Sequence, residues 1–238
     1  HPTIRPKELA RYGHTDWKME DYSFKGGPFR FPNTDENKTI KSDGLTGSVE
    51  LTAEGFTFEQ GHVGSLWKLE HYVGANSVNG VFTATGTTGS IKCGGTWRII
   101  THGTWTGKLR IEKSTDGGTT WTMLREYTSK DDFNANTFAV EDMSGGEEPF
   151  LVRLNMYAYT SGTCNADLST DPFFQQGIVR ITSVAEGGLT ADGEVEREIA
   201  SADETIDWSE GAWSNYRGWP TVVEFLPQDR LIFANTVT

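Results

Sequence analysis

The chain has 238 residues, of which 36% are hydrophobic and 23% charged, a balance that favours a globular protein over a disordered one and allows one large domain or two smaller ones. Its formal net charge is −12, and such an acidic surface disfavours nucleic-acid binding because it repels phosphate. No apolar run approaches the roughly 20 residues that span a bilayer, so we expect no membrane span. The chain begins at His1 without an initiator methionine or a signal-peptide pattern, which suggests a fragment or a processed chain.

Helix signals are confined to two short stretches, PKELARYG at 6–13 and EREIASADE at 196–204. Strand signals dominate between them, because apolar and polar residues alternate at 150–157 and across 108–127. Shorter runs of the same kind lie at 48–53, 65–73, 79–85, 96–101, 137–142 and 177–184. Their spacing of roughly 10–15 residues, with glycine and polar residues between them, predicts an all-β antiparallel sandwich or barrel.

Two polar stretches divide the chain, RFPNTDENKTIKSDG at 30–44 and AEGGLTADGEVERE at 185–198, and both are typical of loops or linkers. The strand-rich block between them covers 45–186. We therefore predict that 45–186 is a β-sandwich domain, inserted into a second domain whose two halves are 1–44 and 187–238.

The stretch STDGGTTW at 114–121 predicts a tight hairpin, because Asp116-Gly117 is a strong turn signal and glycine adopts positive φ without penalty. It resembles the Asp-box of sialidases and other β-propeller proteins at Ser114, Asp116, Gly118, Thr120 and Trp121. The resemblance implies that the Asp116 carboxylate accepts hydrogen bonds from turn amides and that Trp121 packs beneath the turn. A single box in a chain too short for a complete propeller argues against sialidase activity.

Aromatic side chains on loops are the usual platforms for sugar rings. Trp105 lies in THGTWTGK between two predicted strands, so it is the leading candidate for sugar stacking, with Tyr127 and Tyr159 as further candidates. The competing interpretation is that such residues belong to the core of a small sandwich.

Enzymatic chemistry has weaker sequence support. Glycoside hydrolysis needs two carboxylates across a cleft, and the sequence does not place acidic residues such as Glu194 and Glu196 in that way. The five histidines are scattered, and His62 and His71 adjoin apolar strand residues, which predicts packing roles.

Asp131, Asp132 and Asn134 lie in one loop and offer the oxygen ligands that Ca²⁺ prefers. The loop lacks the glycine and the terminal glutamate of an EF-hand, so a turn capped by its own side chains is the preferred interpretation, and we expect no metal or cofactor. The two cysteines, Cys93 and Cys164, do not form a disulfide framework. We expect reduced structural thiols, with pairing after folding as the alternative.

The ends of the chain carry motifs of their own: the His1-Pro2 start, the run Leu9-Ala10-Arg11 before Trp17, GAWS at 211–214, YRGWP at 216–220, and Arg230-Leu231 followed by Phe233. These pieces resemble the tail nozzle (tail tubular B-type) proteins of short-tailed bacteriophages and their prophage relatives. The stretch GHVGSLWKLEH at 61–71 and the STDGGTTW hairpin resemble, more loosely, a domain that some members carry between the ends.

The resemblance implies a non-enzymatic structural role in the virion, in a tail assembled in the bacterial cytoplasm. Such proteins form a ring, usually hexameric, with other tail proteins, so 1–44 and 187–238 would be propeller-type strand segments. The inserted sandwich, jelly-roll or galactose-binding-like in fold, would project outward and contact host surface glycans. Two alternatives stay open, namely a carbohydrate-binding module for host adhesion and a glycan-degrading enzyme.

Overall fold

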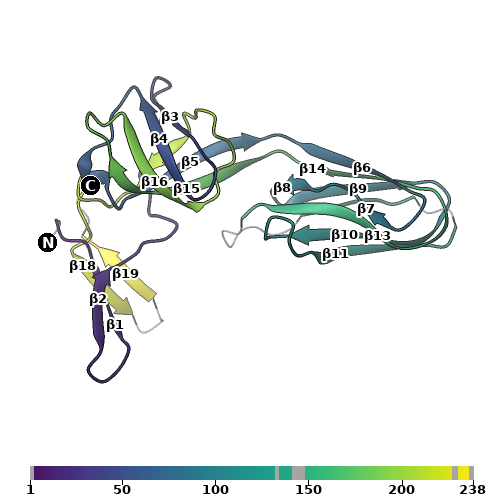
Figure 1. Ribbon diagram of the computed structural model, residues 1–238, viewed down its shortest axis with the longest axis horizontal. Coiled ribbons are helices and arrows are strands. Elements are labelled where there is room, and N and C mark those ends of the chain that lie inside the picture. Colours follow the sequence, from purple (N-terminus) through teal and green to yellow (C-terminus); the bar gives the residue numbers. More distant parts are fainter. Residues whose placement is uncertain (1–2, 132–133, 141–147, 227–229, 236–238) are drawn as a thin grey trace. The chain divides into compact units, whose positions relative to one another are not determined.

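The computed structural model describes residues 3–131, 134–140, 148–226 and 230–235, and its strands pair in antiparallel sheets (Figure 1). The described residues contain no α-helix and one 3-10 turn, η1 (Gln60–His62). The predicted all-β antiparallel fold is therefore confirmed. No helix in the described part of the chain is long and apolar enough to cross a membrane.

The helix signals at 6–13 and 196–204 are misleading, because neither stretch forms a helix. The first contains a strand, β1 (Lys7–Arg11), which pairs with β2 (Trp17–Asp21). The second begins inside β16 (Thr190–Arg197) and continues as a loop. Pairing with a neighbouring strand outweighs the helix propensity of Lys, Glu, Leu, Ala and Arg in these stretches.

The chain divides into two compact units, which are described separately. The terminal unit comprises His1–His71 and Gln176–Thr238, and the central unit comprises Tyr72–Gln175. The central unit is shorter than the predicted 45–186, because β4 (Ser48–Glu54) pairs with β16 in a sheet of the terminal unit.

The central unit is a sandwich of two antiparallel sheets. The five-stranded sheet has the order β11-β10-β13-β7, with β8 also on β13, and the four-stranded sheet has the order β12-β9-β14-β6. Their strands are β6 (Asn76–Phe82), β7 (Gly86–Thr87), β8 (Ile91–Cys93), β9 (Thr96–His102), β10 (Trp105–Ser114), β11 (Thr122–Ser129), β12 (Asn136–Val140), β13 (Phe150–Gly162) and β14 (Cys164–Thr170).

Side chains of both sheets meet in one core, because alternate positions of each strand point inward. In β13, Phe150, Val152, Leu154 and Met156 are buried, and the residues between them are partly exposed. They pack with Trp97, Ile99, Trp105, Leu109, Ile111 and Leu168. The alternation predicted for 150–157 is thus the pattern of a strand with one face on the core.

The terminal unit is built around a six-stranded sheet of order β17-β5-β15-β16-β4-β3. Its remaining strands are β3 (Thr39–Ser42), β5 (Leu66–Val73), β15 (Phe173–Val184) and β17 (Trp208–Glu210). The sheet curls toward a barrel, because Ile40 of β3 bridges Thr205, just ahead of β17, through two backbone hydrogen bonds of 3.0 and 2.8 Å. The interior holds Leu51, Trp67, Leu69, Val179, Ile181 and Ile199.

Two ribbons complete the terminal unit, β1–β2 and the pair β18 (Val222–Leu226) with β19 (Arg230–Ala234) (Figure 1). Their bases meet in an aromatic cluster, where the Phe24 ring lies 4.8 Å from Trp213 and 5.0 Å from Phe233. Arg180 of β15 ties this cluster to the sheet by donating to the carbonyls of Gly64 and Phe24. The propeller-type character of these end segments stays a prediction.

Candidate functional site

The Asp-box stretch forms the turn between β10 and β11. The Asp116 carboxylate accepts hydrogen bonds from the Ser114 hydroxyl at 2.7 Å, from the Thr120 amide at 2.8 Å and from the Thr120 hydroxyl at 2.5 Å. The Thr120 hydroxyl, followed by the Thr120 amide and Ser114, lowers the pKa of Asp116 to about 2. These contacts fasten the turn with an ionised carboxylate.

Trp121 lies against this turn on the outer side of the sheet. Its indole Nε1 donates to the Gly118 carbonyl at 2.9 Å, and Gly118 has the positive φ of 94° that favours glycine. The Arg153 guanidinium lies 4.0 Å from the centre of the Trp121 ring, which is half-buried. Trp121 therefore supports the turn and is itself covered by an arginine.

Trp105 is not a loop residue and does not form a sugar platform, which corrects the leading expectation. It is the first residue of β10, its side chain is 1% exposed, and it belongs to the core. The alternation of β10 sets this inward direction, because Gly107 and Leu109 are also buried. Tyr127 is buried in the same core, and Tyr159 packs against it while donating its hydroxyl to the Gly162 carbonyl at 2.8 Å.

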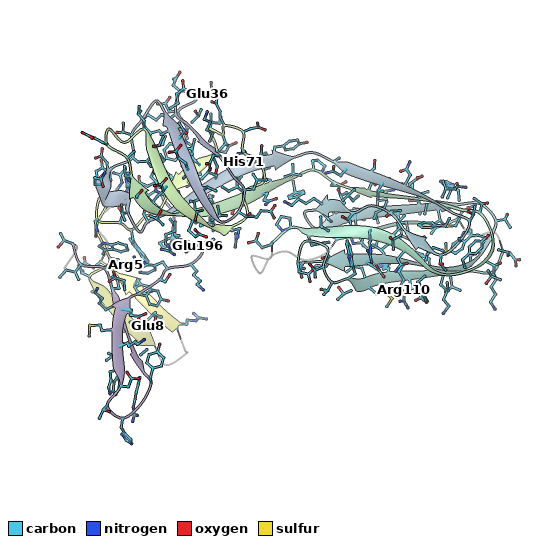
Figure 2. All side chains as sticks on the ribbon, in the orientation of Figure 1. Arg5, Glu8, Glu36, His71, Arg110 and Glu196 are labelled. Atoms are coloured by element: carbon cyan, nitrogen blue, oxygen red, sulfur yellow. The ribbon has the colours of Figure 1, made fainter. Side chains whose placement is uncertain are left out.

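The outer face of the five-stranded sheet carries a network of paired charges. The Arg110 guanidinium lies 3.5 Å from the centre of the Tyr157 ring, and its Nε donates to Glu126 at 3.1 Å (Figure 2 labels Arg110). The Tyr157 hydroxyl donates to the same Glu126 oxygen at 2.6 Å.

The network continues along this face through Glu112. Its carboxylate accepts hydrogen bonds from Arg153 at 2.9 Å and from Asn155 at 2.8 Å. Each of the two carboxylates, Glu112 and Glu126, is thus engaged by an arginine. The face carries two half-buried aromatic rings, each covered by an arginine, and a row of paired charges.

The candidate calcium loop provides little structural support for a metal. Asp131 and Asn134 are exposed, and the Asp131 carbonyl accepts hydrogen bonds from the Trp105 amide at 2.8 Å and the Ser129 hydroxyl at 3.1 Å. Asp132 lies outside the described residues. Among the described side chains, no group of three His, Cys, Asp or Glu residues could hold a metal ion.

Cys93 and Cys164 are both buried and are not joined by a disulfide, as expected for reduced structural thiols. Burial raises the pKa of Cys164 to about 11. A thiol in this environment is protonated and inert, and it packs as a small hydrophobic group.

A buried polar cluster in the terminal unit was not anticipated from the sequence. Glu210 of β17 receives two hydrogen bonds from Arg217, at 2.8 and 2.7 Å, and its Oε1 lies 3.0 Å from His62 Nε2, off the line of a hydrogen bond. Burial alone would raise the pKa of Glu210, but its interactions with His62 and Arg217 outweigh burial and hold it below the usual value.

The cluster clamps separate segments of the terminal unit together. His62 Nδ1 accepts a hydrogen bond from the Glu59 amide at 2.9 Å, while Nε2 faces the Glu210 carboxylate at 3.0 Å. The imidazole also packs edge-on against Trp67 and Tyr216. The clamp joins η1, β17 and the turn at 214–218. His62 and Glu210 lie nearly 150 residues apart in the sequence, so no local sequence pattern could have indicated their contact.

The two ribbons expose apolar side chains that the core does not use. On β1–β2, the exposed fractions are 56% for Leu9, 52% for Trp17 and 67% for Met19. The second ribbon exposes Val222, Val223, Leu231 and Ile232. Because two-stranded ribbons are marginal without a third strand or a covering layer, these surfaces are the candidate assembly site.

No model of a known protein family matches the chain, and the comparison with curated proteins also found no match.

Proposed function

We propose that the chain is a non-enzymatic structural component of a bacteriophage tail, in the nozzle or tail-tip region. One observation carries the proposal. The end segments, whose motifs resemble nozzle proteins, form the two ribbons with exposed apolar side chains. Contiguous exposed apolar surface marks contact with other polypeptides. The proposed partners are other tail proteins, and the proposed parent assembly is a homohexamer.

The way in which the ends are held supports this role. Arg180 fixes the segment around Phe24, and the bidentate Arg217–Glu210 pair fixes the turn that precedes β18. A charged hydrogen-bonded pair of this kind positions a segment more rigidly than neutral contacts do. The ribbons are therefore presented from a fixed base, as an assembly contact requires.

Immunoelectron microscopy tests the proposal. An antibody raised against the purified chain is applied to intact virions of the parent phage, with a phage that lacks the gene product as the control. Gold particles at the tail are the expected result. Labelling absent from the tail, while the same antibody detects the chain in infected cells, would contradict the proposal.

A second candidate is glycan binding by the central unit, and the aromatic outer face favours it. We propose Tyr157 and Trp121, which lie on that face beneath Arg110 and Arg153, in place of Trp105. A glycan array of host surface polysaccharides tests it, with Tyr157→Ala and Trp121→Ala as variants. Binding that both variants retain in full would exclude this face.

The glycan-degrading alternative gains no support from the acidic residues of β16. The Glu194 carboxylate accepts a hydrogen bond from Ser48 at 2.8 Å, and Glu196 forms an ion pair with Arg180 at 2.6 Å. Both carboxylates thus serve the packing of the sheet.

A further inference from the structure

Among the described residues, β2 pairs only with β1, so every second residue of β2 directs its backbone groups toward an open edge. The Tyr22 amide donates to the Pro6 carbonyl at 2.8 Å, and the Tyr12 amide donates to the Asp16 carbonyl at 2.9 Å. Since hydrogen-bonded pairs alternate along an antiparallel ribbon, Lys18 and Glu20 direct their backbone groups toward β1. The backbone groups of Trp17, Met19 and Asp21 therefore point toward the free edge.

One face of the β1–β2 ribbon is apolar at its centre, and each charged side chain at its two ends has a partner within the ribbon. Met19 lies opposite Leu9 at its centre. At one end, the Arg11 guanidinium lies 5.5 Å from the centre of the Trp17 ring, and at the other end Lys7 and Asp21 form an ion pair.

The other face of the ribbon holds two like charges without a cation opposite them. Glu8 lies directly opposite Glu20, and Ala10 lies opposite Lys18 (Figure 2 labels Glu8). Two like charges at directly opposed positions destabilise an antiparallel pair. A cation placed beside Glu20, on the free-edge side of β2, would relieve this repulsion.

The sequence of β2, WKMED, supplies that cation to a second copy of itself. When two β2 edges are placed antiparallel with Met19 opposite Met19, each Lys18 lies opposite Glu20 of the second copy. Trp17 lies opposite Asp21 of the second copy on the apolar face. The backbone groups that point outward are then the ones that meet, giving about six new hydrogen bonds.

We propose that two copies of this chain associate through the outer edges of β2, antiparallel and centred on Met19, to form a four-stranded sheet. The symmetric contact would join the exposed Leu9 and Met19 side chains of both copies into one apolar stripe across the four strands. Four strands also meet the requirement for at least three that isolated ribbons lack.

Charge selects the register. Charged residues on an edge strand normally protect it against pairing. Here a shift of two residues in either direction sets Lys18 opposite Lys18 or Glu20 opposite Glu20. In the Met19-centred register, each Lys18 instead lies opposite Glu20 of the second copy. Repulsion between like charges therefore disfavours the two neighbouring registers, and the Met19-centred register is the favoured one.

The inference does not rest on the proposed tail function. A symmetric contact closes on itself, whereas a sixfold ring needs head-to-tail contacts. The dimer is thus proposed for the free chain in solution. In a ring, head-to-tail contacts with neighbouring subunits would take the place of the β2–β2 contact.

Sedimentation velocity tests the proposal over chain concentrations of about 5 to 500 μM, because an edge of this size belongs to the weak end of specific interfaces. The wild type is expected to shift from monomer to dimer within this range. Lys18→Glu and Glu20→Lys should each weaken association about tenfold or more by opposing like charges across the edge. The double variant Lys18→Glu/Glu20→Lys restores both pairs and should return the Kd to within about threefold of the wild type.

Glu20→Lys best separates an effect on the dimer from an effect on the stability of the ribbon itself. It replaces the Glu8–Glu20 repulsion with an attractive pair inside the ribbon, so the ribbon itself is stabilised while the dimer is weakened. A monomeric wild type at every concentration, or a double variant that associates no better than the two single variants, would overturn the proposal.

Cross-linking reports the register directly. Hydrogen-bonded antiparallel pairs hold their Cα atoms about 5.5 Å apart, which lies within the range of a disulfide. Met19→Cys is therefore expected to form a covalent dimer under mild oxidation. Met123→Cys, at an exposed position of β11, is the matched control, and Cys93 and Cys164 do not interfere because they are buried. Cross-linking at position 19 no faster than at position 123 would contradict the Met19-centred register.

Discussion

Replacing Trp105 with alanine tests its assignment to the core of the central unit. The side chain is 1% exposed, so folding removes nearly all of its surface from water. A buried tryptophan removes about 200 Å² of mostly apolar surface, which at about 25 cal/mol per Å² corresponds to about 5 kcal/mol. Large aromatic-to-alanine substitutions in cores cost about 3–5 kcal/mol, so we expect Trp105→Ala to destabilise the central unit by that amount.

Differential scanning calorimetry measures the effect, because the two units can unfold in separate transitions. For a unit of about 100 residues, this loss corresponds to a fall in Tm of about 15–25 °C, and the transition of the terminal unit should not move. Trp105→Phe is the matched control. It keeps most of the apolar contact, and the indole N–H that it removes has no hydrogen-bond partner among the described residues, so it should cost about 1–2 kcal/mol. A Trp105→Ala variant within about 1 kcal/mol of the wild type would refute the core assignment and return Trp105 to the candidates for sugar stacking.

Three further predictions follow from the clamp, the turn and the thiols. Glu210→Ala should destabilise the terminal unit by about 2–4 kcal/mol in urea unfolding, below the full cost of a broken buried pair because Arg217 is one-third exposed. Arg217→Lys should cost less but still measurably, because lysine cannot form both hydrogen bonds, and an Arg217→Lys variant as stable as the wild type would contradict the bidentate role of Arg217. Because the pKa of Asp116 is about 2 when folded, its stabilisation of the turn is present above the pKa of an unfolded aspartate, about 4, and is lost as the pH falls through about 2; an NMR titration midpoint near 4 would count against the fastened turn. Cys93 and Cys164 should react with a thiol reagent only after unfolding, and rapid reaction of the native chain would show that they are accessible.

The alternation of apolar and polar residues predicts most strands of the sandwich, but it misses β14 and the short strands β7 and β8. Phe150, Val152, Leu154 and Met156 alternate with polar positions because β13 has one face on the core, and periodicity reports that directly. The prediction of a loop or linker at 185–198 is wrong for Thr190–Arg197, which form β16, because Asp192, Glu194 and Glu196 give the stretch a polar composition. These side chains occupy the exposed face of β16 and alternate with the buried residues Ala191 and Gly193. Because Ala191 and Gly193 are small, the sequence does not show the apolar positions that mark a strand.

The candidate site could be predicted only where it is local. The Asp-box residues lie within eight positions, so their sequence pattern specifies the turn that they form. The direction of Trp105 depends on where β10 begins, and the glycines around it made a loop equally plausible. The Glu210–His62 contact and the free edge of β2 depend on the tertiary arrangement, which a single sequence does not encode in any local pattern.

Cryo-electron microscopy of the parent virion tests the central claim most directly. The account predicts density at the tail tip that fits the barrel and the central sandwich, with the apolar sides of β1–β2 and β18–β19 covered by neighbouring polypeptide. A tail whose density is fully explained by other chains, with no place for these two units, would contradict it.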